Sequence, residues 1–234
     1  MGVSSSAAPA SLQLNYFNIG GKGDPVRMLV RHTGFANFVD YRFADGEFPR
    51  LKGEGKFAFG QVPALDVVTA SGEKTQICQT ASILRYLGKV LPGDVYPSDP
   101  VKAALVDACL DQEADLFAGV SCSKYKERFG FGCLDDATIA KVRKSLNDEV
   151  LPRHLGFFES LLSRSSTGWL ADTPGPSCAD FLLGPRLQWL ASGAIDGIST
   201  SILDAFPLVR AFVARFFALP AVAAYTSEQQ AAAK

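Results

Sequence analysis

Leu12-Gln13-Leu14-Asn15-Tyr16-Phe17, followed by a glycine-rich segment at residues 18–23, is the stretch of sequence that decides the fold. Side chains alternate with period two along a strand, so Leu12, Leu14 and Tyr16 share one face. Tyr16 ends this buried row at the start of an open loop. Two roles for Tyr16 are compatible with these residues: its hydroxyl points into a cleft, or it packs and bonds a backbone carbonyl.

Helical and strand patterns alternate after this strand as far as residue 91. Asp24 as N-cap, Pro25 at the first helical position and Gly34 as the closing residue predict a helix over residues 24–33. Alternating residues predict a strand at 39–43, and two short strands at 64–68 and 75–78 are predicted as a hairpin around the turn at Ser71-Gly72. Thr80 is expected to cap a helix ending at Leu91. The predicted order is βαβ followed by ββα, an α/β fold.

Helical periodicity takes over after residue 97, which predicts an all-helical second part. The first helix of this part, over residues 104–117, is expected to bury Ala104, Leu105 and Ala108. Further helices are predicted at 139–162, 181–190 and 208–219. The expected domains are a flexible tail at residues 1–11, a first domain at 12–91, a linker at 92–100 and a helical domain at 101–230.

Composition excludes several classes of function. The 23 basic and 24 acidic residues nearly balance, so we expect no nucleic-acid partner. No apolar stretch approaches the roughly 20 residues of a membrane-spanning helix, and the first ten residues lack the pattern of a signal peptide, which predicts a cytoplasmic protein without stable membrane insertion. Five cysteines without paired spacing and two separate histidines give no basis for a disulfide framework or a metal site.

The first six residues, Met-Gly-Val-Ser-Ser-Ser, match the pattern for N-myristoylation. A flexible tail rich in serine and alanine has the same composition. Whether Gly2 carries an acyl chain therefore stays open.

Two short motifs have the chemistry of a binding site. Pro63 stands at the start of a strand, and a cis Val62–Pro63 bond would leave the Val62 backbone free to pair with an extended peptide ligand. We predict the cis bond; a trans proline that ends a loop is the alternative. Gln79 and Thr80 begin a helix, where free N–H groups and a hydroxyl attract a carboxylate, although Thr80 could act only as a cap.

Together these segments resemble the glutathione transferase family over residues 12–226. The Tyr-Phe-Asn start, the Phe-Gly-Gln-Val-Pro segment, the Gln-Thr pair and the capping box at Ser177 and Asp180 are most similar to the sigma class and its alpha, mu and pi relatives. The resemblance implies a thioredoxin-like α/β amino-terminal domain followed by an all-α domain.

The resemblance also implies roles for individual residues. Tyr16 would stabilise the glutathione thiolate, and Asp115 would reach the glutathione of a neighbouring subunit, which implies a homodimer. The other implied glutathione-binding residues are Phe17, Lys22, Phe48, Lys52, Gln61, Val62, Pro63, Gln79 and Thr80. Thr80, Lys22 and Phe48 replace the serine, arginine and tryptophan that are usual or frequent at these positions. Sigma members that bind magnesium use three aspartates; Ala114 interrupts that pattern here, so no metal is expected.

The expected activity is conjugation of the glutathione thiolate to small apolar electrophiles. Two alternatives stay open, a glutathione-dependent isomerase of a lipid endoperoxide like prostaglandin D synthase, and a catalytically idle structural or binding protein on the same scaffold. The sequence identifies neither the electrophile nor the residues that line its pocket.

Overall fold

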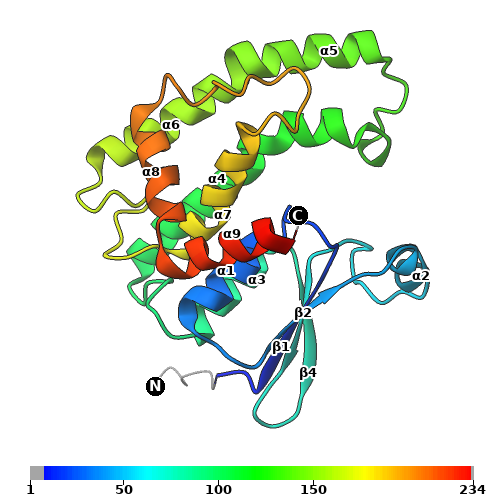
Figure 1. Cartoon of the computed structure of the whole chain (residues 1–234), viewed down its shortest axis with the longest axis vertical. Helices are drawn as coiled ribbons and strands as arrows, with labels where there is room; N and C mark the ends of the chain where they lie inside the picture. Colours follow the sequence, from blue (N-terminus) through cyan, green and yellow to red (C-terminus); the bar gives the residue numbers. More distant parts are fainter. Residues whose placement is uncertain (1–7, 233–234) are drawn as a thin grey trace. The chain divides into compact units, whose positions relative to one another are not determined.

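A computed structural model describes residues 8–232 of the chain (Figure 1). The myristoylation pattern lies outside these described residues. The chain divides into two compact units. The first contains the residues up to Tyr96 together with those from Leu219 onward, and the second runs from Pro97 to Ala218.

The first unit is built on a four-stranded mixed sheet in the order β2-β1-β3-β4. Its strands are β1 (Ser11–Tyr16), β2 (Phe38–Arg42), β3 (Ala64–Val68) and β4 (Lys74–Cys78). β1 is parallel to β2 and antiparallel to β3, with Leu14 opposite Asp40 and Leu65. Leu12 and Leu14 are buried, as the alternation in the sequence predicts.

Two of the helices in this unit were expected from the sequence. They are α1 (Asp24–Thr33) and α3 (Thr80–Val90), which lie together on one side of the sheet in Figure 1. Asp24 is the first helical residue of α1 rather than its cap, which is Gly23, and Gly34 closes the helix with φ 70°. The left-handed conformation at Gly34 is the one that favours glycine at a helix C-terminus.

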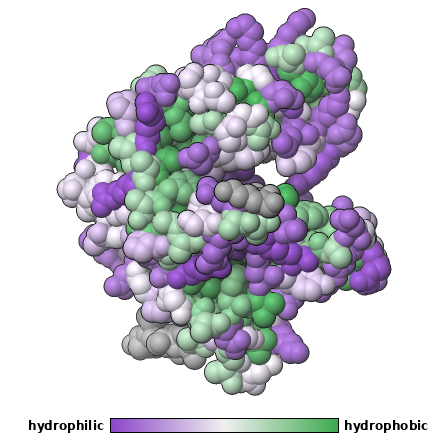
Figure 2. All heavy atoms as spheres, in the orientation of Figure 1, coloured by the Kyte–Doolittle hydropathy of each residue, from purple (hydrophilic) through white to green (hydrophobic). Residues whose placement is uncertain are grey.

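The sequence patterns missed the helices α2 (Glu47–Gly53) and α9 (Pro220–Ala232). α2 is short, contains Pro49 and buries only Leu51, so it has no apolar period to detect. α9 buries Val222 and Tyr225 and packs against α1 within the first unit. The outer end of α2 is mostly hydrophilic in Figure 2 (purple).

The second unit is helical, as predicted. It contains α4 (Pro100–Lys124), the 3-10 turn η1 (Lys126–Phe129), α5 (Asp136–Ser145), the π-helical turn η2 (Leu146–Val150), α6 (Leu151–Arg164), α7 (Cys178–Leu190) and α8 (Pro207–Phe217). The single helix predicted over residues 139–162 is therefore interrupted by η2. Pro152 follows this turn and has no N–H to donate to the helical ladder, which accounts for the interruption.

The prediction of which face of α4 is buried is wrong. Ala104, Leu105 and Ala108 are exposed, and the buried residues of α4 are Val106, Cys109, Leu110, Glu113, Leu116, Phe117, Val120 and Ser123. The buried face includes a charged residue, Glu113, so it does not show as an apolar period in the sequence. Glu113 is buried because Arg186 of α7 donates to its Oε1 at 2.8 Å, with the guanidinium over the Phe117 ring.

Within residues 8–232, no single helix has both the length and the apolar composition of a membrane span. Helices α8 and α9 reach these values only when both are counted together across a sharp bend.

Candidate functional site

Tyr16 ends β1 with its ring buried, as the sequence predicts. Its hydroxyl oxygen accepts a hydrogen bond from the backbone N–H of Lys22 at 3.0 Å. Because the Tyr16 oxygen accepts from a fixed backbone N–H, its own proton is polarised for donation to another group. The side chain of Lys22 is exposed.

Two glycines allow the loop after β1 to close on the Tyr16 ring. A Cβ on Gly21 would lie 2.7 Å from the Tyr16 hydroxyl oxygen, and one on Gly23 would lie 2.6 Å from Tyr16 Cδ1. Both distances are far below van der Waals contact, so only glycine fits at these positions. The Lys22 N–H of this loop is thereby held next to the hydroxyl.

An aromatic cluster packs beside Tyr16. The Phe17 ring lies 5.4 Å from the Tyr16 ring and 4.9 Å from the Phe48 ring, and Phe48 lies 5.7 Å from both Phe43 and Phe57. Phe17 meets Tyr16 and Phe48 edge to face and Phe48 stacks with Phe57, both arrangements that aromatic pairs prefer. Phe17, Phe48 and Val62 are partly buried against one cluster, so the structure brings these three predicted site residues together.

The Val62–Pro63 peptide bond is cis, which confirms the prediction from the sequence. The β3 ladder begins at Ala64, one residue after the proline. Among residues 8–232, none forms a backbone hydrogen bond with the N–H or C=O of Val62. The Val62 backbone is therefore unpaired among the described residues of the first unit.

The N-cap of α3 lies one position before the one that was expected. Gln79 is the N-cap of α3 with a φ of 72°, and Thr80 is the first helical residue. The expectation that Thr80 caps the helix is therefore wrong. The Thr80 Oγ1 is buried, and the part of the chain that the structure describes gives it no hydrogen-bond partner. An unpaired buried hydroxyl is costly, so an oxygen acceptor from a ligand would relieve it.

The remaining predicted site residues are more scattered. Lys52 lies on α2 with its side chain over Gly60, since a Cβ on Gly60 would be 3.1 Å from Lys52 Cε, and Gln61 follows in the chain. Asp115 is exposed on α4 of the second unit.

The sequence reasoning missed Arg27, whose side chain is 1% exposed and donates hydrogen bonds to carbonyls of the loop after Tyr16. One signal was available: Asp24 and Arg27 stand at i and i+3 on a helix whose other residues at 25–30 are apolar.

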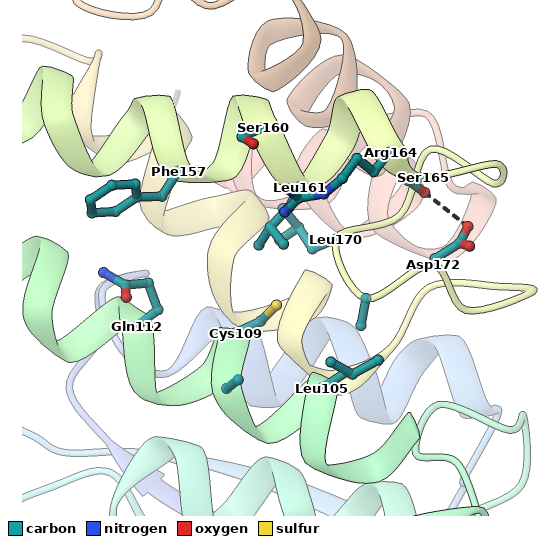
Figure 3. Close-up of a pocket in the computed structure, with 12 residues that line it drawn as sticks. Leu105, Cys109, Gln112, Phe157, Ser160, Leu161, Arg164, Ser165, Leu170 and Asp172 are labelled. Atoms are coloured by element: carbon teal, nitrogen blue, oxygen red, sulfur yellow. Dashed lines mark hydrogen bonds between the residues drawn. The ribbon is translucent and has the colours of Figure 1, made fainter. Parts of the chain in front are cut away.

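A pocket of about 400 Å³ lies within the second unit, between α4 and α6 (Figure 3). Leu105, Cys109 and Gln112 of α4 face Phe157, Leu161 and Arg164 of α6 across it, and at one end Ser165 donates to Asp172 at 3.1 Å. Burial raises the pKa of the Cys109 thiol to about 12. The Cys109 thiol therefore lines the pocket in its uncharged form and is no nucleophile at neutral pH.

Comparisons with known proteins give one family. The family model "Glutathione S-transferase, C-terminal domain" matches residues 128–229. A probable glutathione S-transferase of Caenorhabditis elegans is 26% identical and aligns over 92% of this chain and 95% of its own length. Glutathione S-transferase P of Bos taurus is 26% identical over 92% of this chain and 91% of its own.

Solved structures agree in fold. The glutathione S-transferase of Ascaris lumbricoides superposes with a TM-score of 0.73 at 25% identity, covering 94% of this chain and 97% of that one. The prostaglandin synthase D of Nilaparvata lugens gives a TM-score of 0.77 at 24% identity, covering 94% and 98%. A structure from the hookworm Necator americanus, described as a monomeric glutathione S-transferase, gives a TM-score of 0.71 at 24% identity. The match covers 94% of this chain and 97% of that one. The carboxy-terminal part of the chain thus matches the C-terminal domain of glutathione S-transferases, and over most of its length the chain is similar to proteins of that name.

Proposed function

We propose that the protein is an enzyme that transfers glutathione to small apolar electrophiles. The observation that carries this proposal is Tyr16, whose hydroxyl oxygen accepts the Lys22 N–H. The same unit contains a Val62 backbone and a buried Thr80 hydroxyl that have no hydrogen-bond partner within residues 8–232. These groups match the parts of a γ-glutamyl tripeptide, which are a thiol, an extended backbone and a carboxylate.

Glutathione would bind at two places, the start of α3 and the backbone of Val62. The γ-glutamyl carboxylate would accept hydrogen bonds from the N–H groups at the start of α3 and from Thr80 Oγ1, where the helix dipole favours an anion. The cysteinyl unit would pair with the N–H and C=O of Val62 beside Pro63. Gln79 would contribute to the carboxylate end, and Gln61, Lys52, Lys22 and the Phe48 cluster would border the rest of the ligand.

Catalysis would depend on ionising the thiol. A thiol with a pKa of about 8.5 is only about 3% ionised at pH 7, and the thiolate is the nucleophile. Lowering this pKa by about 2 units requires about 2.7 kcal/mol, which is within the range of one hydrogen bond to a charged atom. Tyr16 would donate this bond, and the thiolate would then attack the electrophilic carbon.

The finer class is part of the proposal. The sigma-like class rests on the Tyr-Phe-Asn start and the Gln-Thr pair, and some members of that class isomerise a lipid endoperoxide with glutathione instead of conjugating it. Both reactions need the glutathione thiolate that Tyr16 would stabilise, so the glutathione site is common to both. A structural or binding protein without activity would have no need for a hydroxyl at the mouth of this site.

We also propose a homodimer in the cytoplasm, in which Asp115 completes the partner's glutathione site. The exposed face of α4 combines Ala104, Leu105 and Ala108 with the acids Asp111 and Asp115. Leu105 is 53% exposed and Phe157 across the pocket is 50% exposed, values that are high for large apolar side chains. A second copy that covers this face would remove them from water, and its bound glutathione would bring an ammonium group to Asp115.

No metal enters the proposed chemistry. Residues 8–232 contain no group of three or more His, Cys, Asp or Glu side chains placed to hold a metal ion. The proposed partners are glutathione, an apolar electrophile and a second copy of the chain.

The decisive experiment is retention on immobilised glutathione followed by conjugation assays with chlorodinitrobenzene and a lipid endoperoxide. Retention and conjugation would support the transferase, and endoperoxide conversion without conjugation would favour the isomerase. Absence of retention and of both activities would refute the proposed function. Sedimentation showing a fully active monomer at micromolar concentration would refute the dimer-completed site.

A further inference from the structure

A polar network fixes the loop that follows Tyr16, and its centre is the buried guanidinium of Arg27. Its Nη1 donates to the carbonyl of Ile19 at 2.7 Å, and its Nη2 donates to the carbonyl of Phe17 at 3.3 Å. Its Nε donates to Asp40 Oδ1 of β2 at 2.9 Å, and its Nη1 also donates to Asp24 Oδ1 at 3.1 Å. Arg27 therefore ties the loop to both the sheet and α1.

Tyr225 of α9 completes this network. Its hydroxyl donates to Asp24 Oδ1 at 2.6 Å, the same oxygen that accepts from Arg27. Tyr225 is 3% exposed, and burial together with the charge and hydrogen bond of Asp24 raises its pKa. The phenol therefore stays protonated and remains the donor. Arg31 lies over its ring at 5.1 Å, which fixes the ring on α1.

A second connection runs from α9 to the same loop. Arg42 donates from Nη2 to Gln229 Oε1 at 3.1 Å and from Nη1 to Asn18 Oδ1 at 2.8 Å. The Arg42 Nε donates to Asp40 Oδ2 at 2.8 Å, so both arginines share one carboxylate. α9 thus reaches the loop through Asp24 on one side and through Arg42 on the other.

We infer that Tyr225, supported by Gln229, is a positioning residue for thiol activation: α9 holds the residue 17–23 loop so that the Lys22 N–H stays on the Tyr16 oxygen. This inference rests on the proposed function. When the loop loosens, the Lys22 N–H leaves the Tyr16 oxygen, and the Tyr16 hydroxyl becomes a weaker donor to the thiolate. α9 therefore affects the chemistry without touching the substrate.

The test compares Tyr225→Phe with the wild-type full-length protein. The substitution removes one oxygen and keeps the ring on α1. We expect hydrogen-exchange protection of the amides at residues 20–23 to fall about tenfold, while protection in β1 and β3 is unchanged. The thiol pKa read from the pH dependence of kcat/KM should rise by about half a unit, which lowers kcat/KM at neutral pH about threefold. The KM for glutathione should stay the same.

Two further variants make the test specific. Thr226→Val removes a hydroxyl from the neighbouring residue. Among the described residues this hydroxyl bonds only the Val222 carbonyl of its own helix, at 2.9 Å, so the variant should change neither readout. Gln229→Ala, at a half-buried position, should reproduce the effect of Tyr225→Phe in the same direction.

The two proposals fail in different ways. Unchanged loop protection and an unchanged thiol pKa in Tyr225→Phe would overturn the positioning role, and so would a loss of protection across the whole first unit, because that would show a general structural role. A wild-type protein that is not retained on glutathione and has neither activity would refute the proposed function alone, and loop exchange would still decide whether α9 holds the loop.

Discussion

Removing the Tyr16 hydroxyl is the most direct test of the proposed chemistry. Tyr16→Phe keeps the ring and its contact with Phe17 at 5.4 Å, and it removes the oxygen that accepts the Lys22 N–H at 3.0 Å. Lys22 is an exposed loop residue, so we expect water to take the place of the Tyr16 oxygen at its N–H in the variant. The fold should therefore lose at most about 1 kcal/mol of stability, the usual net value of one hydrogen bond.

The effect on the rate should be much larger than the effect on stability. A hydrogen bond to a charged atom contributes about 1.5 to 3 kcal/mol, which corresponds to about one to two units in the thiol pKa. Tyr16 donates to the ionised form, so its removal raises this pKa. Conjugation near pH 7 should fall about 10- to 100-fold, and the two rates should converge above the raised pKa, where the thiol ionises in both proteins.

The assay is the pH dependence of conjugation at saturating electrophile, together with glutathione affinity, which should stay nearly the same. Tyr41→Phe is the matched control, because the Tyr41 hydroxyl bonds Glu47 at 2.5 Å instead of the loop. An apparent thiol pKa that is the same in Tyr16→Phe and the wild type would refute the role of Tyr16.

Three other substitutions test separate parts of the structure. Thr80→Val should weaken glutathione binding about tenfold or more while leaving the melting temperature nearly unchanged, since the Thr80 Oγ1 has no partner within residues 8–232; calorimetric binding that is unaffected would contradict its role. Asp115→Ala should weaken glutathione binding without changing the thiol pKa, and equal affinity in equilibrium dialysis would count against the dimer-completed site. Asp180→Ala removes the acceptor of the Ser177 and Leu170 N–H groups, at 2.7 and 3.0 Å, and should cost about 2 to 5 kcal/mol in urea unfolding; a loss below 1 kcal/mol would show that water replaces the carboxylate.

The sequence predicted the parts of the fold that have a clear period. Leu12, Leu14 and Tyr16 alternate along β1, and α1 carries both a proline at its start and a glycine at its end. The cis bond before Pro63 was predicted from its position at a strand start. α2 escaped prediction because it buries one residue, and the core face of α4 was misassigned because Glu113 interrupts it.

The candidate site was predictable only where neighbouring residues in the chain form a motif. Tyr16, Val62 and Thr80 each belong to such a motif, and their roles stay predictions. Nothing local links Tyr225 to Asp24, since 201 positions separate them and the bond exists only after α9 packs on α1. That the Thr80 hydroxyl has no hydrogen-bond partner within residues 8–232 could not be predicted either, because the sequence does not specify which residue begins α3.

The division of the chain has a consequence for its synthesis. The second unit, from Pro97 to Ala218, is inserted between α3 and α9 of the first unit. A chain growing on the ribosome therefore makes all of the helical unit before α9 exists. The strands of the first unit are translated early. Helix α1 of the same unit gains its contacts with α9 only after the residues from Leu219 onward have been made. A chain terminated at Ala218 would contain every residue of the second unit and would leave the apolar groups beneath α9 exposed to aggregation.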